Sequence, residues 1–414
     1  MLISAVLGFG CPGRLTGQIT GPKWAAVGGT IYVSPTADPI KNGVVLVEDG
    51  KISTVGSKGS VRVPANFQIL DCSGSTIVAG FWNSHVHFFE RKWADAAGIP
   101  ALELTRQLED MFTRYGFTSV FDLGSSWDNT QAIRKRVVSG EVAGPRIRST
   151  GEVLIAPGAM PPPSILGILG DLPLKNLEVT TAADVEQAAK MQLARGVDGI
   201  KLHLQPPPAP KPPFPRDGFE AAVRLAHSAN KPVFVHPASA ADVLAAMRAG
   251  VDVIAHTTPQ SGPWDARITE AIRDRSVALT PTLTLWRSSL RHDRISARDG
   301  LTRIADGQLR AWAAAGGTVL FGTDIGAIDY DPSEEYALMH EAGLSFRQIL
   351  ASLTTAPAER FGDAGRLGRI AVGLTADLVV LRGDPSRDIA ALSAVAYTIK
   401  DGKLIYGSPA LKNP

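Results

Sequence analysis

The sequence predicts an α/β fold, a (β/α)8 TIM barrel with a small β-sandwich domain formed from both chain termini. Three observations indicate it: eight strand-like segments alternate with helix-like ones, β-hairpin patterns occur near both ends, and 414 residues suffice for one large core and a smaller one. We expect the sandwich to comprise residues 23–79 and 366–414, and the barrel residues 80–365, after a leader-like segment at 1–22.

Composition narrows the class of partner. The chain is 44% hydrophobic and 20% charged, which is typical of a globular protein, and its net charge of +2 is spread without a basic block. We therefore expect a small-molecule substrate and no nucleic acid, and a homo-oligomer stays open. The two cysteines, Cys11 and Cys72, allow at most one disulfide bond.

The first residues, "MLISAVLGFGC", form an apolar run that is too short to span a bilayer. They lack a basic segment ahead of that run, yet they are similar to the remnant of an export signal. We expect no membrane span, and both a cytoplasmic and an exported location remain open.

The two ends of the chain share one β pattern. "GVVLVEDGKISTVG" (43–56) and "AVAYTIKDGKLIYG" (394–407) each place an Asp-Gly pair, Asp49-Gly50 and Asp401-Gly402, between alternating apolar runs. Such a pair is a strong signal for a two-residue hairpin turn. The similarity of the two turns predicts that both ends of the chain belong to one small β domain.

Eight candidate strands lie at regular intervals between these ends. Helical patterns such as 181–196 and 240–250 follow them, and several of these patterns end on Gly. An open doubly-wound sheet is the alternative, but no G-x-G-x-x-G follows the first strand. The expected strands are 76–85, 118–124, 146–151, 199–204, 232–237, 251–257, 277–283 and 318–324.

Metal-binding residue types stand where these strands end, and in a TIM barrel the carboxyl ends of the strands build the active site. Four histidines and one aspartate exceed what one tetrahedral zinc ion needs, so two ions fit better. A two-metal site needs a bridging anion, and Lys201 could provide it only if chemically altered. The candidate ligands at the strand ends are His85, His87, Lys201, His236, His256 and Asp324, and His203 lies two residues after Lys201.

Two alternatives compete with this reading of the strand ends. A single buried histidine is more often a core residue than a ligand, but five strands ending in this way favour metal binding. Lys201 could instead form a Schiff base, although such a site does not need four convergent histidines.

The set "HVH", "GIKL", "FVHP", "IAHT" and "GTDIG", with the closing "GRIAVGLTADLVVL", resembles the amidohydrolase superfamily, within it the imidazolonepropionase-like and prolidase-like metal-dependent hydrolases. The resemblance implies two divalent ions, Zn²⁺ by preference, bridged by a carboxylated Lys201. It implies that His85, His87 and Asp324 hold the buried ion and that His236 and His256 hold the exposed one. Within this resemblance, imidazolonepropionase itself is similar to a form of the site with one metal ion and no such lysine. The presence of Lys201 therefore argues against imidazolonepropionase activity.

The resemblance implies hydrolysis by a metal-bound hydroxide, with Asp324 as the base that returns the proton to the leaving group. The apolar, proline-rich loops suit an apolar substrate group. Arg287, with Arg291 and His292 beside it, could bind a substrate carboxylate or lie on a solvated helix face, and a carboxylate would imply a dipeptide or N-acyl amino acid. His203 is a further candidate for lining the pocket. A lactonase, esterase or phosphotriesterase on the same centre, and a non-catalytic amidohydrolase-like scaffold, remain alternatives.

Overall fold

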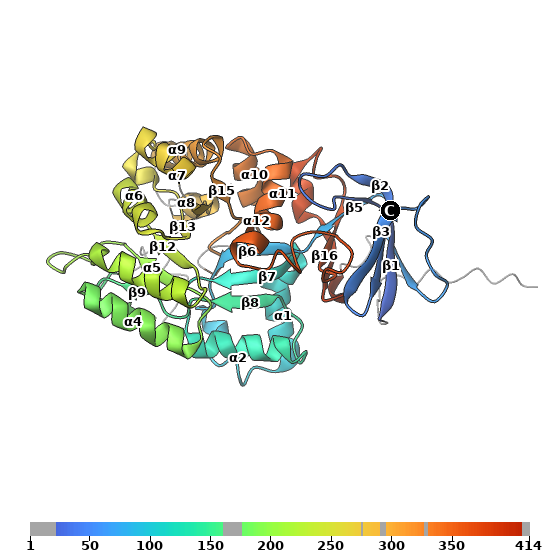
Figure 1. Ribbon diagram of the computed structural model, residues 1–414, viewed down its shortest axis with the longest axis horizontal. Coiled ribbons are helices and arrows are strands. Elements are labelled where there is room, and N and C mark those ends of the chain that lie inside the picture. The colour runs from blue at the N-terminus through green and yellow to red at the C-terminus, as the bar shows by residue number, and fades with distance from the viewer. Residues whose placement is uncertain (1–21, 160–175, 275, 290–294, 327–329, 408–414) are drawn as a thin grey trace, which may run out of the picture.

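The computed structural model describes residues 22–159, 176–274, 276–289, 295–326 and 330–407. A twisted sheet built from both ends of the chain forms one end of the molecule, and parallel strands with surrounding helices form the rest (Figure 1). Apart from Pro22, the leader-like segment lies outside the described residues, as do Cys11, Arg291 and His292. Cys72 is buried and forms no disulfide.

The terminal sheet has eight strands, and the order β18-β17-β16-β5-β1-β2-β3 with β4 beside β1 joins them into one continuous sheet. The sequence predicts a sandwich of two sheets, whereas β5 pairs with both β1 and β16 and so connects the N-terminal and C-terminal strands directly. The strands are β1 (Lys23–Ile31), β2 (Ile40–Glu48), β3 (Lys51–Ser57), β4 (Gln68–Asp71), β5 (Ser75–Ala79), β16 (Leu378–Arg382), β17 (Val395–Lys400) and β18 (Lys403–Gly407).

The two predicted hairpin turns are confirmed. Asp49, Gly50, Asp401 and Gly402 all have positive φ angles, of 49°, 80°, 53° and 73°, as a type I′ turn requires. The turns also pack against each other, because a Cβ on Gly402 would lie 2.6 Å from the Gly50 Cα. The Trp24 indole donates to the Gly402 carbonyl at 2.9 Å and fastens this contact.

The parallel strands form two sheets of order β6-β7-β8 and β10-β9-β11-β12-β13-β14-β15. A strand overlaps each of the eight segments expected from the sequence, although the last is reduced to Thr318–Val319, and β9 and β10 are additional. The elements are β6 (Phe81–Val86), β7 (Phe117–Asp122), β8 (Arg146–Ser149), β9 (Leu154–Ile155), β10 (Leu177–Glu178), β11 (Ile200–His203), β12 (Val233–His236), β13 (Val253–Ala255), β14 (Ala278–Thr280) and β15 (Thr318–Val319).

Helices follow most of these strands and lie outside them (Figure 1). Helix α4 has a capping box at Thr181 and Asp184 and ends at Gly196, as the sequence pattern predicts. The helices are α1 (Ala101–Met111), α2 (Trp127–Val138), α4 (Ala182–Arg195), α5 (Phe219–Ser228), α6 (Ala240–Ala249), α7 (Ala266–Asp274), α8 (Leu283–Ser289), α9 (Ile295–Ala314), α10 (Ser333–Glu341), α11 (Phe346–Leu353) and α12 (Thr355–Arg360), with 3-10 turns at Arg91–Trp93, Thr113–Tyr115, Arg216–Gly218, Pro259–Ser261 and Ile389–Ser393.

One predicted strand is divided in the structure. The apolar run at 76–85 separates at Gly80 into β5, which belongs to the terminal sheet, and β6, which belongs to the parallel strands. Gly80 is required there because a Cβ would collide with the Thr118 side chain and lie 3.0 Å from the Asp377 Cβ. A periodicity argument cannot show this break, since the residues on both sides are apolar and buried.

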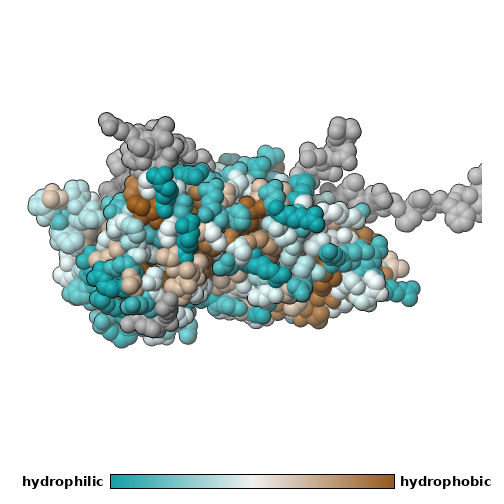
Figure 2. Space-filling view, turned by 90° about the horizontal axis from the view of Figure 1, so that it is seen from above, coloured by the Kyte–Doolittle hydropathy of each residue, from teal (hydrophilic) through white to brown (hydrophobic). Residues whose placement is uncertain are grey.

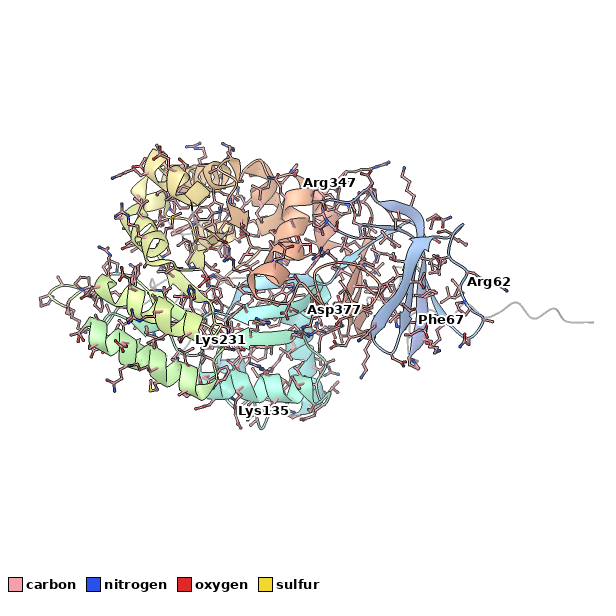
Figure 3. All side chains as sticks on the ribbon, in the orientation of Figure 1. Arg62, Phe67, Lys135, Lys231, Arg347 and Asp377 are labelled. Carbon is pink, nitrogen blue, oxygen red and sulfur yellow. The ribbon has the colours of Figure 1, made fainter. Side chains whose placement is uncertain are left out.

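Ion pairs and hydrogen bonds connect the terminal sheet to the helical part. Arg146 of β8 pairs with Asp377, just before β16, and with Asp401 of the second hairpin. Arg347 of α11 donates to the carbonyls of Pro35 and Ala37 at 2.8 and 2.9 Å. Figure 3 labels Asp377 and Arg347, which both lie at this junction.

The surface is mainly polar. Hydrophilic side chains cover much of the face seen from above, and the hydrophobic areas between them are small and separate (Figure 2). Among the described helices, none is both long and apolar enough to cross a bilayer. The exposed large hydrophobic side chains are Ile69, Leu102, Val138, Met191 and Val372.

Candidate metal centre

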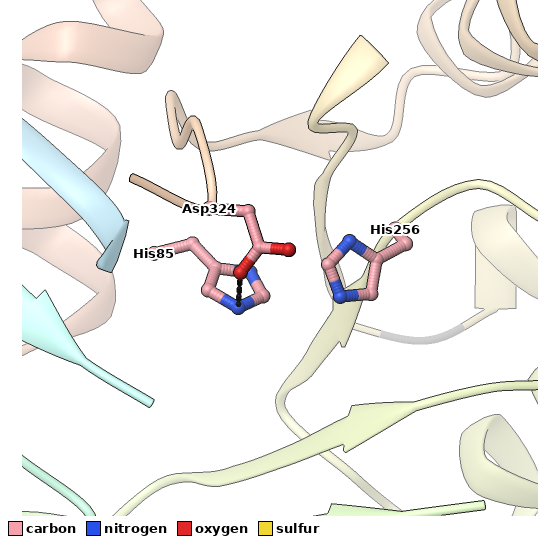
Figure 4. A group of neighbouring side chains, drawn as sticks. All are labelled: His85, His256 and Asp324. Atoms are coloured by element: carbon pink, nitrogen blue, oxygen red, sulfur yellow. Dashed lines mark ion pairs between the residues drawn. The ribbon is translucent and has the colours of Figure 1, made fainter. Parts of the chain in front are cut away.

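The carboxyl ends of the parallel strands bring one compact group of donors together. One ligand atom from each of His85, His256 and Asp324 lies within 4.8 Å of the others, and all three side chains are buried (Figure 4). They come from β6, from the residue after β13, and from the segment after β15. The sequence-based expectation divides these residues between two ions, whereas the structure places His256 beside His85 with ring centroids 4.7 Å apart.

Asp324 is the common partner of His85 and His87. One of its oxygens, Oδ1, lies 2.8 Å from His87 Nε2 and 3.1 Å from His85 Nε2. His87 Nδ1 lies 3.0 Å from the Gly124 carbonyl, which can only accept, so Nδ1 carries a proton. Nε2 and the carboxylate oxygen 2.8 Å from it must then share a cation, and either a proton or a metal ion can take that place.

The protonation states suit metal binding. Burial lowers the pKa of His85 and of His203 to about 3, and it holds the pKa values of His236 and His256 well below the usual range. Burial raises the pKa of Asp324, but the His85 and His87 rings outweigh burial and hold that pKa well below its ordinary value. Neutral imidazoles and an ionised carboxylate are the forms that bind divalent ions.

Lys201 of β11 lies in the same interior. Its side chain is buried, and Nζ has no hydrogen-bond partner among the described residues. Burial lowers the pKa of this amine from 10.5 to about 7, against the opposing effect of Asp324. His85 Nδ1 and His203 Nδ1 are likewise buried and without partners in the described part of the chain. Buried polar groups normally have hydrogen-bond partners, so these three unpartnered nitrogens in one interior indicate that a bound group completes it.

Backbone strain marks the same strand ends. His256, Thr282 and Asp324 have φ angles of +77°, +46° and +58°, a region that non-glycine residues avoid. Each such residue costs on the order of 1–3 kcal/mol and persists only where its surroundings enforce it. Three of them around one group of donors indicate that the fold keeps these side chains in place at the expense of stability.

The other expected site residues fall into two groups. His203 stacks on His236 with ring centroids 4.1 Å apart, and His236 lies 4.6 Å from His256, so both belong to the same cluster. Arg287 instead pairs with Glu334 at 3.0 Å and lies 3.8 Å from Glu341, both on α10. A carboxylate contact of Arg287 therefore stays a prediction, and it would compete with this ion pair.

Sequence reasoning missed the residues that hold these histidines. Asp122 accepts from Ser125, Ser149 and the Gly124 amide at 2.6, 2.6 and 3.3 Å, and so fixes the loop whose carbonyl orients His87. Thr282 contacts His256 Nδ1 at 2.6 Å. The position of Asp122 at the end of β7 was the one signal for its role, since it matches the other strand-end positions.

Parallel strands whose carboxyl ends carry neutral histidines, a buried lysine and an ionised aspartate define a class of metal-dependent enzyme. The chain belongs to the amidohydrolase family, whose family model matches residues 76–405. The expected membership of the amidohydrolase superfamily is confirmed, and the protein is an amidohydrolase-family enzyme. It is similar to a solved prolidase that is 26% identical. A comparison with curated proteins found no significant match.

Solved structures with the same fold include prolidases. A Xaa-Pro dipeptidase with bound methionine in the active site is 23% identical, with a TM-score of 0.78 over 93% of this chain and 100% of that chain. A prolidase complexed with N-methylphosphonate-L-proline is 26% identical, with a TM-score of 0.76 over the same shares. The ochratoxinase of A. niger is 21% identical, with a TM-score of 0.72 over 94% of this chain and 96% of that one.

Proposed function

We propose that the protein hydrolyses the amide C–N bond of a dipeptide or N-acyl amino acid that carries an apolar group. The observation that carries this proposal is the convergence of histidines, Lys201 and Asp324 on one buried cluster at the ends of parallel strands. The 26% identical prolidase, solved with a phosphonate derivative of proline, favours a substrate of this kind.

We infer that the parallel strands close into a (β/α)8 barrel spanning residues 80–365, beside a β domain of residues 23–79 and 366–414. Backbone hydrogen bonds from Ser84 to Phe321 at 2.8 Å and from Asp324 to His85 at 2.9 Å support closure on one side, and one from Asp198 to Ser149 at 2.8 Å supports it on the other. A single apolar cluster also includes side chains from six strand segments, namely Trp82, Phe121, Phe234, Val253, Ala278 and Leu320.

For metal binding we propose two divalent ions, with zinc favoured by the nitrogen-rich donor set. His85, His87 and Asp324 would hold one ion, and His236 and His256 the other. Lys201 would join them as a carbamate, because a pKa lowered to about 7 leaves much of the amine unprotonated at neutral pH. The neutral amine nitrogen attacks CO₂, an N–C bond forms, and one proton is released, so the uncharged amine becomes an anionic carbamate. The ions, when bound, supply Lewis acidity that lowers the pKa of water and polarises a carbonyl.

Asp324 is the proposed proton carrier. It is ionised and buried, and its Oδ1 contacts Nε2 of both His85 and His87. It would accept a proton from the attacking water as the new C–O bond forms. It would then return that proton to the leaving nitrogen as the C–N bond breaks. His203 would line the substrate pocket, since its ring stacks on His236 and its Nδ1 has no partner among the described residues.

The test is a product screen. Protein reconstituted with Zn²⁺ or Mn²⁺ and bicarbonate is given separate pools of dipeptides, N-acyl amino acids, esters and phosphotriesters, with the Asp324→Asn variant as the blank. We expect free amino acid from the first two pools and none from the blank. Turnover confined to esters or phosphotriesters would replace the amide proposal, and no turnover in any pool would favour a non-catalytic scaffold.

A further inference from the structure

We propose that Thr282 and Glu335 are positioning residues that hold His256 in the tautomer and orientation needed to bind a metal ion. Neither residue contacts the other donors of the cluster in any described contact. The inference rests on the proposed metal centre and assigns to it two residues that the sequence analysis did not single out.

The Thr282 hydroxyl determines which nitrogen of His256 is protonated. Thr282 Oγ1 lies 2.8 Å from the Pro281 carbonyl and 2.6 Å from His256 Nδ1. A carbonyl can only accept, so the hydroxyl proton belongs to the bond with Pro281. The hydroxyl oxygen then accepts from His256, and Nδ1 carries the ring proton. Nε2 of His256 is therefore unprotonated and free to bind a metal ion.

Thr282 can make this contact because its backbone is strained. Its φ of +46° is unfavourable for a β-branched residue, and the residue is completely buried. Thr282 lies between β14 and α8, and in this conformation its hydroxyl reaches His256 Nδ1. Such a conformation persists only if the following residues are held firmly.

Glu335 of α10 holds the residues that follow Thr282. Its Oε1 accepts from the Leu283 amide at 2.9 Å, and its Oε2 accepts from the Thr284 amide and hydroxyl, both at 2.8 Å. The carboxylate is fully buried and has no ion pair in the described part of the chain. A buried carboxylate without a cation is costly, and these three bonds to the residues directly after Thr282 account for its presence. Trp286 adds a further tie by donating to Thr257 Oγ1 at 2.8 Å.

Second partners of metal-bound histidines are worth about 10- to 100-fold in metal affinity, because they fix the tautomer and the ring orientation. We therefore expect Thr282→Val to weaken binding of the less tightly held ion by about 10- to 100-fold, whereas Thr282→Ser, which keeps the hydroxyl, stays within about threefold of wild type. Glu335→Gln replaces one acceptor by an amide donor, and it should weaken metal binding in the same direction.

The experiment measures Zn²⁺ affinity by chelator competition, together with the visible spectrum of the Co²⁺-substituted protein. Thr398→Val is the matched control, since that hydroxyl is also buried and donates to a backbone carbonyl, of Thr113 at 2.6 Å, in the terminal sheet. Support requires weaker binding and an altered Co²⁺ spectrum in Thr282→Val alone of the three threonine variants, with thermal stability no lower than that of the control.

Wild-type affinity and spectrum in Thr282→Val would overturn the inference and leave the proposed metal centre standing. An equal loss of affinity in Thr398→Val would also overturn it, because the effect would then be general destabilisation. If wild-type protein bound no divalent ion under the same conditions, the proposed metal centre would fail and the inference with it.

Discussion

Replacing Lys201 with Met should make the metal-free protein more stable. The lysine is buried and its amine has no hydrogen-bond partner in the described part of the chain, so its positive charge is unfavourable in the folded state. The drop in pKa from 10.5 to about 7, at about 1.4 kcal/mol for each pH unit, puts this penalty at about 5 kcal/mol. Water that reaches the interior reduces it, and we expect a gain of about 2 to 5 kcal/mol. Methionine is uncharged and of similar length, so it fills the same space.

The sign of the pH dependence follows from the same pKa. Unfolded lysine stays protonated up to about pH 10.5, whereas Lys201 in the folded, metal-free protein loses its proton near pH 7. The unfolded chain binds more protons between these values, so wild-type stability rises with pH across that window. The advantage of Lys201→Met should therefore be largest below pH 7 and shrink towards pH 10.

Urea unfolding of chelator-treated proteins in bicarbonate-free buffer, at several pH values from about 6.5 to 9.5, measures the difference. Lys201→Arg is the control, because it keeps the charge and should lose stability. A Lys201→Met protein that is no more stable than wild type near pH 6.5, or an advantage that does not shrink as the pH rises, would refute the argument that a buried charged amine opposes folding.

Three further predictions concern single residues. Asp324→Asn should keep bound metal and lower kcat by about 10²- to 10⁴-fold, because it removes the proton carrier. The measurement is a steady-state assay with a substrate from the screen. Activity within a few fold of wild type would contradict the role. Gly322→Ala should destabilise the protein by about 1–3 kcal/mol in urea unfolding and reduce its metal content. The new Cβ would collide with the Thr280 side chain and lie 2.8 Å from the His85 Cβ. Unchanged stability and metal content would show that the strand end can rearrange to accept the methyl group. Burial raises the pKa of Asp306 to about 6, so its ionisation lowers stability as the pH rises from about 4 to 6. Asp306→Asn should therefore raise Tm at pH 8 by on the order of 1 °C, a figure discounted for the partial exposure of the side chain. The gain should vanish near pH 4.

Local patterns predicted most of the secondary structure. The Asp-Gly turns are decided by their own two residues, because a type I′ turn needs positive φ at both positions. The eight parallel strands follow from apolar runs with a regular spacing, and those runs also locate the donors at the strand ends. The break at Gly80 was not predictable, since it depends on the packing of Thr118 and Asp377 against one glycine.

The arrangement within the site depends on long-range contacts that no local pattern carries. Thr282 and Glu335 contact His256 or its neighbours from other elements, and neither a threonine at a strand end nor a glutamate in a helix signals such a role. Arg287 follows the seventh strand, which favoured a substrate contact, but its guanidinium pairs with Glu334 on α10. Which ion each histidine binds is a matter of side-chain directions, and it stays a prediction.

The metal content of the purified protein tests the central claim most directly. Wild-type protein and the Lys201→Ala variant would be reconstituted with Zn²⁺ and bicarbonate, freed of excess metal, and measured by elemental analysis. Two ions per wild-type chain, with the second lost from Lys201→Ala, is the result that we predict. A wild-type chain without bound metal, or a variant that retains both ions, would contradict a binuclear centre bridged by Lys201.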